Sequence, residues 1–113
     1  MTPFELTRRE TGDPLRVVLD AAGELDLTNA NELEEQLEQL PLPAGASLAL
    51  DLNRVVFIDS AALHVLFRTA RRLGRDRFSV LLDPNAAIAR TIAIVGMPEV
   101  ATVESPLAEA PPA

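Results

Sequence analysis

The chain contains no cysteine, lysine, tyrosine or tryptophan among its 113 residues, and its only aromatic residues are four phenylalanines. The lack of cysteine excludes disulfides and thiolate metal sites. No hydrophobic run approaches the ~20 residues of a membrane span, and the N-terminus lacks the apolar core of a signal peptide. We therefore expect a cytoplasmic protein that is not inserted in a membrane.

Positive charge is also scarce: the chain has 10 basic residues, all of them arginine, and 17 acidic residues, which gives a formal net charge of −7. This balance disfavours nonspecific binding to nucleic-acid phosphates and docking on anionic lipids. A regulator that binds another protein, and not nucleic acid, fits this charge.

The hydrophobic pattern is typical of one small α/β domain. A chain of this length forms a single core. Its order of elements predicts a mixed sheet of four to five strands packed with about three to four helices, in a domain over residues 1–104 with a disordered C-terminal tail over 105–113. Strands are expected over 4–9, 15–22, 48–52 and 78–82, with an edge strand over 100–103, and helices over 30–40, 60–73 and 84–95.

Two helix starts carry recognisable signals. Gly23 to Thr28 is expected to be a loop, and Asp26, Thr28 or Asn29 is expected to cap the helix that follows; Glu32 lies three residues after Asn29, as in a capping box. Asp83 followed by Pro84 is typical of an N-cap and a first helical residue, which predicts that the third helix begins there.

The most informative segment changes from a strand pattern to a helix pattern at Asp59 and Ser60. This places a hydroxyl at a helix N-terminus, where backbone N–H groups are unpaired and the helix dipole is positive. Serine is a favoured N-cap, and a phosphoryl group on it would lie in an anion-binding position. Ser60 is therefore either a structural cap or a residue modified by another enzyme.

The sequence from Asp51 to Leu66, with Asp-Leu-x-x-Val-x-Phe-Ile-Asp-Ser before a Leu-rich helix, resembles the STAS domain family, and within it bacterial anti-sigma factor antagonists. The Gly-Glu-Leu-Asp segment that begins at Gly23 resembles the family's loop before the first helix. The resemblance implies that Ser60 is the phosphoacceptor. It also implies a partner-binding rim made of Gly23, Glu24, Asp26, Thr28, Asp59, Ser60, Ala61 and Ala62.

The same resemblance implies a function by partner switching. The unphosphorylated protein would bind an anti-sigma factor that is itself a serine kinase and so free a sigma factor; a serine phosphatase would reverse the phosphorylation of Ser60. ATP and Mg²⁺ belong to the kinase, so no cofactor is expected here, and the chain is expected to be a monomer or a weak dimer.

Ala61 and Ala62 replace a hydroxyl residue and a glycine common in the family. That leaves a second interpretation open, a non-catalytic STAS subunit of an ABC-type lipid transporter or of a larger sensory complex.

The sequence offers little support for catalysis or metal binding. His64 is the only histidine, and it has neither a second histidine nor a cysteine as a metal partner. Ser60 and His64 are four residues apart on one helix and lack a third group to orient them, so we predict that the chain is not an enzyme. Four arginines are predicted to form a solvated face that offsets the helix dipole, with docking to an acidic partner as the alternative: Arg68, Arg71, Arg72 and Arg75.

Overall fold

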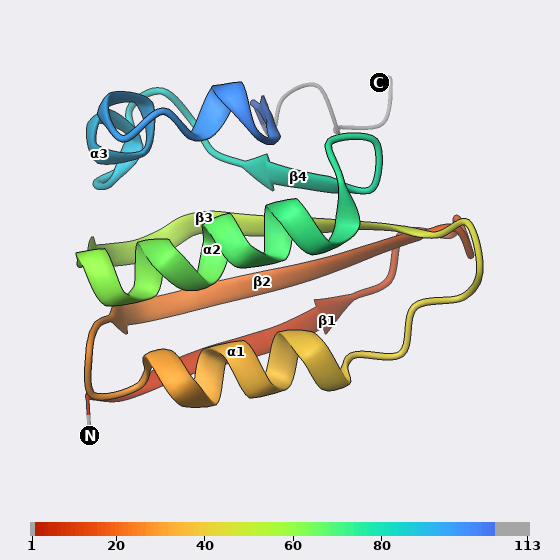
Figure 1. Cartoon of the computed structure of the whole chain (residues 1–113), viewed down its shortest axis with the longest axis horizontal. Helices are drawn as coiled ribbons and strands as arrows, with labels where there is room; N and C mark the ends of the chain where they lie inside the picture. The colour runs from red at the N-terminus through yellow and green to blue at the C-terminus, as the bar shows by residue number, and fades with distance from the viewer. Residues whose placement is uncertain (1, 106–113) are drawn as a thin grey trace.

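A five-stranded mixed sheet with its helices packed on one face forms the fold of the computed structural model, which describes residues 2–105 (Figure 1). The prediction of a single small α/β domain is confirmed. Met1 and residues 106–113, most of the expected tail, lie outside the described residues. The strands are β1 (Phe4–Arg9), β2 (Arg16–Leu25), β3 (Ser47–Ile58), β4 (Phe78–Leu81) and β5 (Thr102–Glu104); the helices are α1 (Ala30–Gln39), α2 (Ser60–Leu73), α3 (Ala89–Ile94) and the short 3₁₀ helix η1 (Met97–Glu99).

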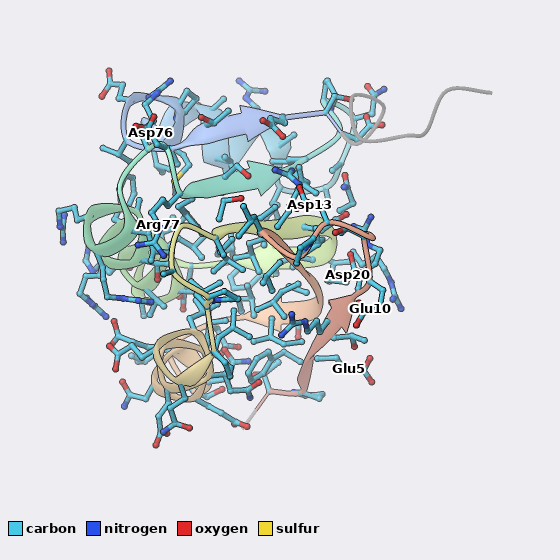
Figure 2. The ribbon with its side chains drawn as sticks, turned by 90° about the vertical axis from the view of Figure 1, so that its right-hand side faces the viewer. Glu5, Glu10, Asp13, Asp20, Asp76 and Arg77 are labelled. Atoms are coloured by element: carbon cyan, nitrogen blue, oxygen red, sulfur yellow. The ribbon has the colours of Figure 1, made fainter. Side chains whose placement is uncertain are left out.

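The strands lie in the sheet in their order along the chain, β1-β2-β3-β4-β5. β1 is antiparallel to β2, and the other neighbours are parallel. Because successive parallel strands are added in one direction and such crossovers are right-handed, the connecting helices fall on the same face. Figure 2 shows this arrangement from one end, with Asp20 on the side of the sheet away from α1 and α2.

Aliphatic side chains fill the space between the sheet and the helices. Leu48, Leu50 and Leu52 alternate along β3 and are fully buried, as their spacing predicts. They pack in one cluster with Leu33 of α1 and Leu66 of α2. Full burial of each such side chain contributes about 1.5–3 kcal/mol, so this layer is the main source of stability.

Charged side chains cross the opposite face of the sheet. Arg9 on β1 donates from Nη2 to Asp20 Oδ1 on β2 and to Asp51 Oδ2 on β3, both at 2.8 Å. The hydrogen bond to Asp20 is the main reason that the pKa of Arg9 lies above its ordinary value. The three side chains remain partly exposed, so each ion pair contributes only about 0–1 kcal/mol.

Two strands are longer than the sequence predicted. β2 runs to Leu25, so Gly23 and Glu24 belong to a strand and not to a loop. β3 runs to Ile58, well past the predicted end at Leu52. Two register shifts against β2 interrupt the alternation of buried and exposed residues on which the prediction depended.

The third helix begins later than predicted, at Ala89. The Asp83 carboxylate accepts the backbone N–H of Asn85 at 2.8 Å, which forms a turn where the helix was expected. Ile88 and Ile92 are buried as their spacing predicts, whereas Val95 caps the helix and is exposed.

The four arginines predicted as a solvated face are exposed, and three of them also bond to neighbouring elements. Arg68 pairs with Glu34 of α1. Arg72 donates to the Leu37 carbonyl oxygen at 3.4 Å, and Arg75 donates to the Pro98 carbonyl oxygen at 2.7 Å. The first two bonds connect α2 with α1, and the third connects the turn after α2 with η1.

Candidate functional site

Ser60 is the first residue of α2 and is exposed, directly after β3 ends at Ile58. The N-cap is Asp59 and not Ser60: its Oδ1 accepts the backbone N–H of Ala62 at 3.1 Å. An ionised carboxylate is a strong acceptor for helix N–H groups, which explains why it takes this role. No hydrogen bond to the Ser60 hydroxyl is found among residues 2–105, so the hydroxyl is available to another molecule.

Asp59, which lies between β3 and α2, also bonds to the segment between β2 and α1. Its Oδ2 accepts the backbone N–H of Leu27 at 2.9 Å, and its own N–H donates to the Leu25 carbonyl oxygen at 3.1 Å. One carboxylate therefore fixes the start of α2 and the segment between β2 and α1 together, and sets the position of Ser60 against that segment.

The loop between β2 and α1 is organised by Asn29, which is fully buried. Its Oδ1 accepts the backbone N–H of Asp26 at 2.9 Å, and its Nδ2 donates to the carbonyl oxygens of Glu24 and Thr2 at 2.8 and 2.9 Å. The predicted capping box with Glu32 is wrong, since Asn29 makes no side-chain bond to the helix. Its amide instead bonds to three backbone groups, which ties the loop to the N-terminal segment.

Asp26 and Thr28, predicted as partner-contact residues, are bonded to each other. Asp26 Oδ1 accepts from Thr28 Oγ1 at 2.6 Å and from the Thr28 backbone N–H at 2.9 Å. Hydrogen bonding from the Thr28 hydroxyl, and then from the Thr2 hydroxyl, lowers the pKa of Asp26. Their direct role is to shape the loop that carries Leu27.

The remaining predicted rim residues differ in exposure. Glu24 is exposed on β2 and Ala61 is half-buried, packed against the core. Ala62 is completely buried in the core, so the prediction that it contacts a partner is wrong. Two residues into α2, the helix has turned this side chain toward the sheet.

Gly23 has a structural role beneath the start of β1. Its φ is +102°, and a Cβ there would lie 2.8 Å from the Pro3 carbonyl oxygen. We expect Gly23→Ala to lower the free energy of unfolding by about 2–3 kcal/mol, measured by urea denaturation, because backbone strain and a clash combine. Gly12→Ala is the control, since Gly12 has φ +80° with nothing near its Cβ position. Equal losses for the two variants would contradict the clash.

Three exposed apolar side chains that the sequence did not single out lie on the segments joined at Asp59, next to Ser60 in the chain: Leu27, Val56 and Phe57, with exposed fractions of 76%, 64% and 48%. We call them the apolar rim. Leu27 is tied to Asp59, while Val56 and Phe57 precede Ser60 on β3. The sequence contained a signal for the exposure of Val56 and Phe57: residues 55–58 are all apolar, and consecutive strand residues cannot all face the core. Exposed apolar residues gathered in this way mark interaction surfaces.

Within residues 2–105, no group of three or more histidine, cysteine, aspartate or glutamate side chains could hold a metal ion. None of the helices in that range is both long and apolar enough to cross a membrane. His64 is exposed on α2, four residues after Ser60.

The sequence matches the family model described as the STAS domain over residues 6–110. No curated protein matches the chain.

Several solved structures share the fold. An anti-sigma factor antagonist from Mycobacterium paratuberculosis has a TM-score of 0.74 and 24% identity, covering 90% of this chain and 86% of that one. The protein TM1081 from Thermotoga maritima, in its NMR structure, has a TM-score of 0.68 and 22% identity, with coverage of 97% and 85%. The Bacillus cell fate determinant SpoIIAA in its phosphorylated form has a TM-score of 0.57 and 16% identity, with coverage of 91% and 92%.

Proposed function

This chain belongs to the STAS domain family, and we propose that it is an anti-sigma factor antagonist, which binds an anti-sigma factor and so frees a sigma factor. The observation that carries the proposal is the exposed Ser60 hydroxyl at the start of α2, flanked by the apolar rim. The similarity to structures of anti-sigma factor antagonists, one of them from a mycobacterium, supports it.

Phosphorylation of Ser60 is the proposed switch. A phosphoryl group adds about −1.5 to −2 charges and three acceptor oxygens. The N-terminal end of the 14-residue helix α2 stabilises that charge. A partner surface that had excluded water around the hydroxyl would then face an unpaired charge, and the complex would dissociate. We propose that the anti-sigma factor is the serine kinase, and that a serine phosphatase restores binding in the cytoplasm.

The apolar rim is the proposed anchor for the partner, because a few buried apolar and aromatic residues usually dominate binding. We expect Phe57→Ser to weaken binding by about 10-fold or more, measured by calorimetry, while the melting temperature changes little, since Phe57 is already half-exposed. Leu15→Ser is the matched control, because Leu15 is 52% exposed at the other end of the sheet, before β2. Equal losses of affinity for both variants would contradict the role of the apolar rim.

The proposal is tested by affinity capture from the native host with the wild-type chain and Ser60→Asp, and identification of the bound proteins by mass spectrometry. We expect a soluble kinase-like anti-sigma factor that the wild type retains and the variant loses. Recovery of an ABC transporter subunit or of a sensory scaffold, in equal amounts by both forms, would overturn the proposal in favour of a fixed interaction subunit.

A further inference from the structure

β3 has an open edge on the side that faces β4. The parallel ladder between the two strands ends at Asp51 and Leu81, whereas β3 continues to Ile58 and remains paired with β2 on its other side. Within the described chain, residues 52–58 therefore have no strand on the β4 side. Such an edge offers backbone N–H and C=O groups to another extended chain.

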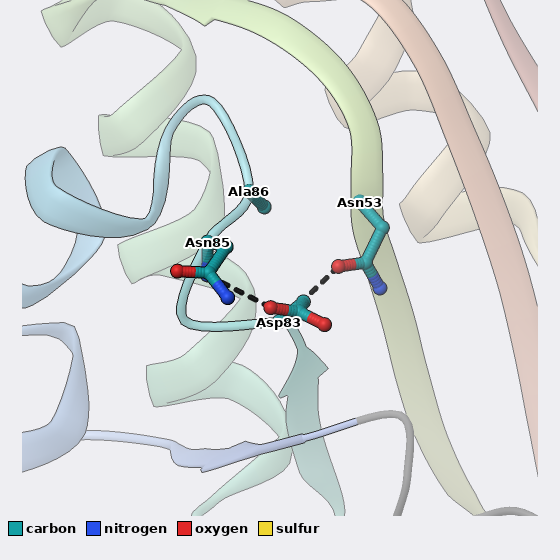
Figure 3. A pocket seen from close by; sticks show the side chains of 4 residues that line it. All are labelled: Asn53, Asp83, Asn85 and Ala86. Carbon is teal, nitrogen blue, oxygen red and sulfur yellow. Dashed lines mark hydrogen bonds between the residues drawn. The ribbon is translucent and has the colours of Figure 1, made fainter.

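The loop after β4 leaves a hollow of about 490 Å³ next to this edge, lined by Asn53, Asp83, Asn85 and Ala86 (Figure 3). Asn53 closes the ladder, because its Oδ1 accepts the Asp83 backbone N–H at 2.7 Å. Beyond that bond, no backbone hydrogen bond joins residues 54–58 to the loop over 83–88 in the part of the chain that the structure describes. The hollow thus separates the loop from the free edge.

Apolar side chains lie along this edge where protective residues are usually found. The two register shifts against β2 insert extra residues into β3, and bulged residues leave backbone groups unpaired and redirect side chains. As a result, the consecutive residues Val56 and Phe57 are both exposed. Free edges in monomers are normally guarded by charges or proline; here Arg54 is the one charge between residues 52 and 58, and the apolar exposure of Val56 and Phe57 beyond it indicates a docking surface.

Asp83 is the one charged residue that lines the hollow. Asp83 uses Oδ1 to accept the Asn85 backbone N–H at 2.8 Å, and no bond to its Oδ2 is found among residues 2–105. Arg54, the cation of this part of β3, lines a different hollow with Pro3 and Phe4. A cationic side chain therefore complements the hollow, and the net charge of −7 favours the same choice.

We propose that this edge of β3 binds an extended segment of the partner protein by strand addition, with an apolar side chain against Val56 and a lysine or arginine in the hollow. The identity of the partner rests on the proposed function. Because Ile58 is followed by Asp59 and Ser60, the added segment would end next to the proposed phosphoacceptor. Phosphorylation of Ser60 would then weaken the binding of this same segment.

The strand site is tested without the natural partner, by NMR titration of the ¹⁵N-labelled full chain with two capped synthetic pentapeptides. One alternates valine with arginine, and the other alternates valine with glutamate. We expect the basic peptide to shift the amide signals of residues 53–57 and of Asp83, Asn85 and Ala86, and to bind at least about 10-fold more tightly than the acidic one. Asn85→Arg, which places a cation in the hollow, is expected to abolish these shifts.

Ala87→Arg is the matched control, since Ala87 is exposed in the same loop but does not line the hollow. Equal binding of both peptides, shifts confined to other residues, or unchanged binding by Asn85→Arg would each overturn the strand site. If neither peptide bound in the NMR titration, but the wild type still captured an anti-sigma factor that Ser60→Asp did not, only the strand site would be overturned and the proposed function would remain. Peptide binding without capture of an anti-sigma factor would overturn the proposed function alone.

Discussion

Replacement of Ser60 by aspartate is expected to weaken binding of the proposed anti-sigma factor by roughly 30- to 5,000-fold, which corresponds to about 2–5 kcal/mol for a charge left unpaired in an interface. Ser60→Ala is expected to stay within a few-fold of the wild type, since the hydroxyl is small. Calorimetric titration of the purified partner into each variant measures the dissociation constants.

The same aspartate is expected to leave the fold intact, because Ser60 is exposed at the first position of α2. A negative charge at a helix N-terminus stabilises the helix by about 0.3–1 kcal/mol, so the melting temperature should stay level or rise slightly. Leu15→Asp adds the same charge at the other end of the sheet and should not affect binding. A similar loss of affinity for Leu15→Asp would show that net charge, and not the position of Ser60, controls the complex.

Asn29→Ala is expected to give the largest loss of stability among the polar residues of the site. It removes the partners of three backbone groups, the Asp26 N–H and the carbonyl oxygens of Glu24 and Thr2. These bonds are partly buried and a buried group left unsatisfied costs about 1–3 kcal/mol, so we expect a total loss of roughly 3 kcal/mol in urea denaturation.

Gln36→Ala provides the comparison for Asn29→Ala, because Gln36 is exposed and makes one long bond, at 3.4 Å, to Glu32. Its free energy of unfolding should change by no more than about 0.5 kcal/mol. If Asn29→Ala were as mild as Gln36→Ala, water would have to satisfy the three backbone groups, and Asn29 would not organise the loop.

The sequence was sufficient for the elements whose side chains repeat regularly. Leu48, Leu50 and Leu52 alternate and so predicted a strand, and Leu63 and Leu66 predicted the buried face of α2. The extensions of β2 and β3 were missed because bulges break the period of two that defines a strand pattern. The start of α3 was missed because the Asp83 side chain favours a turn over a cap.

The candidate site was predicted in part, through local sequence around Asp59 and Ser60. What could not be predicted depends on contacts between residues distant in sequence. Asp59 bonds to Leu27 and Asn29 bonds to Thr2 only after the sheet has formed. The exposure of Leu27 also follows from that three-dimensional arrangement, since its place between two polar residues does not reveal it.

The most direct test of the account is to incubate the purified chain with the captured anti-sigma factor and ATP, and to map the phosphorylated residue by mass spectrometry while the bound fraction is measured. The account predicts one phosphoryl group, on Ser60, and release of the phosphorylated chain from its partner. Phosphorylation at another residue, or a Ser60-phosphorylated chain that stays bound as tightly as the unmodified one, would contradict it.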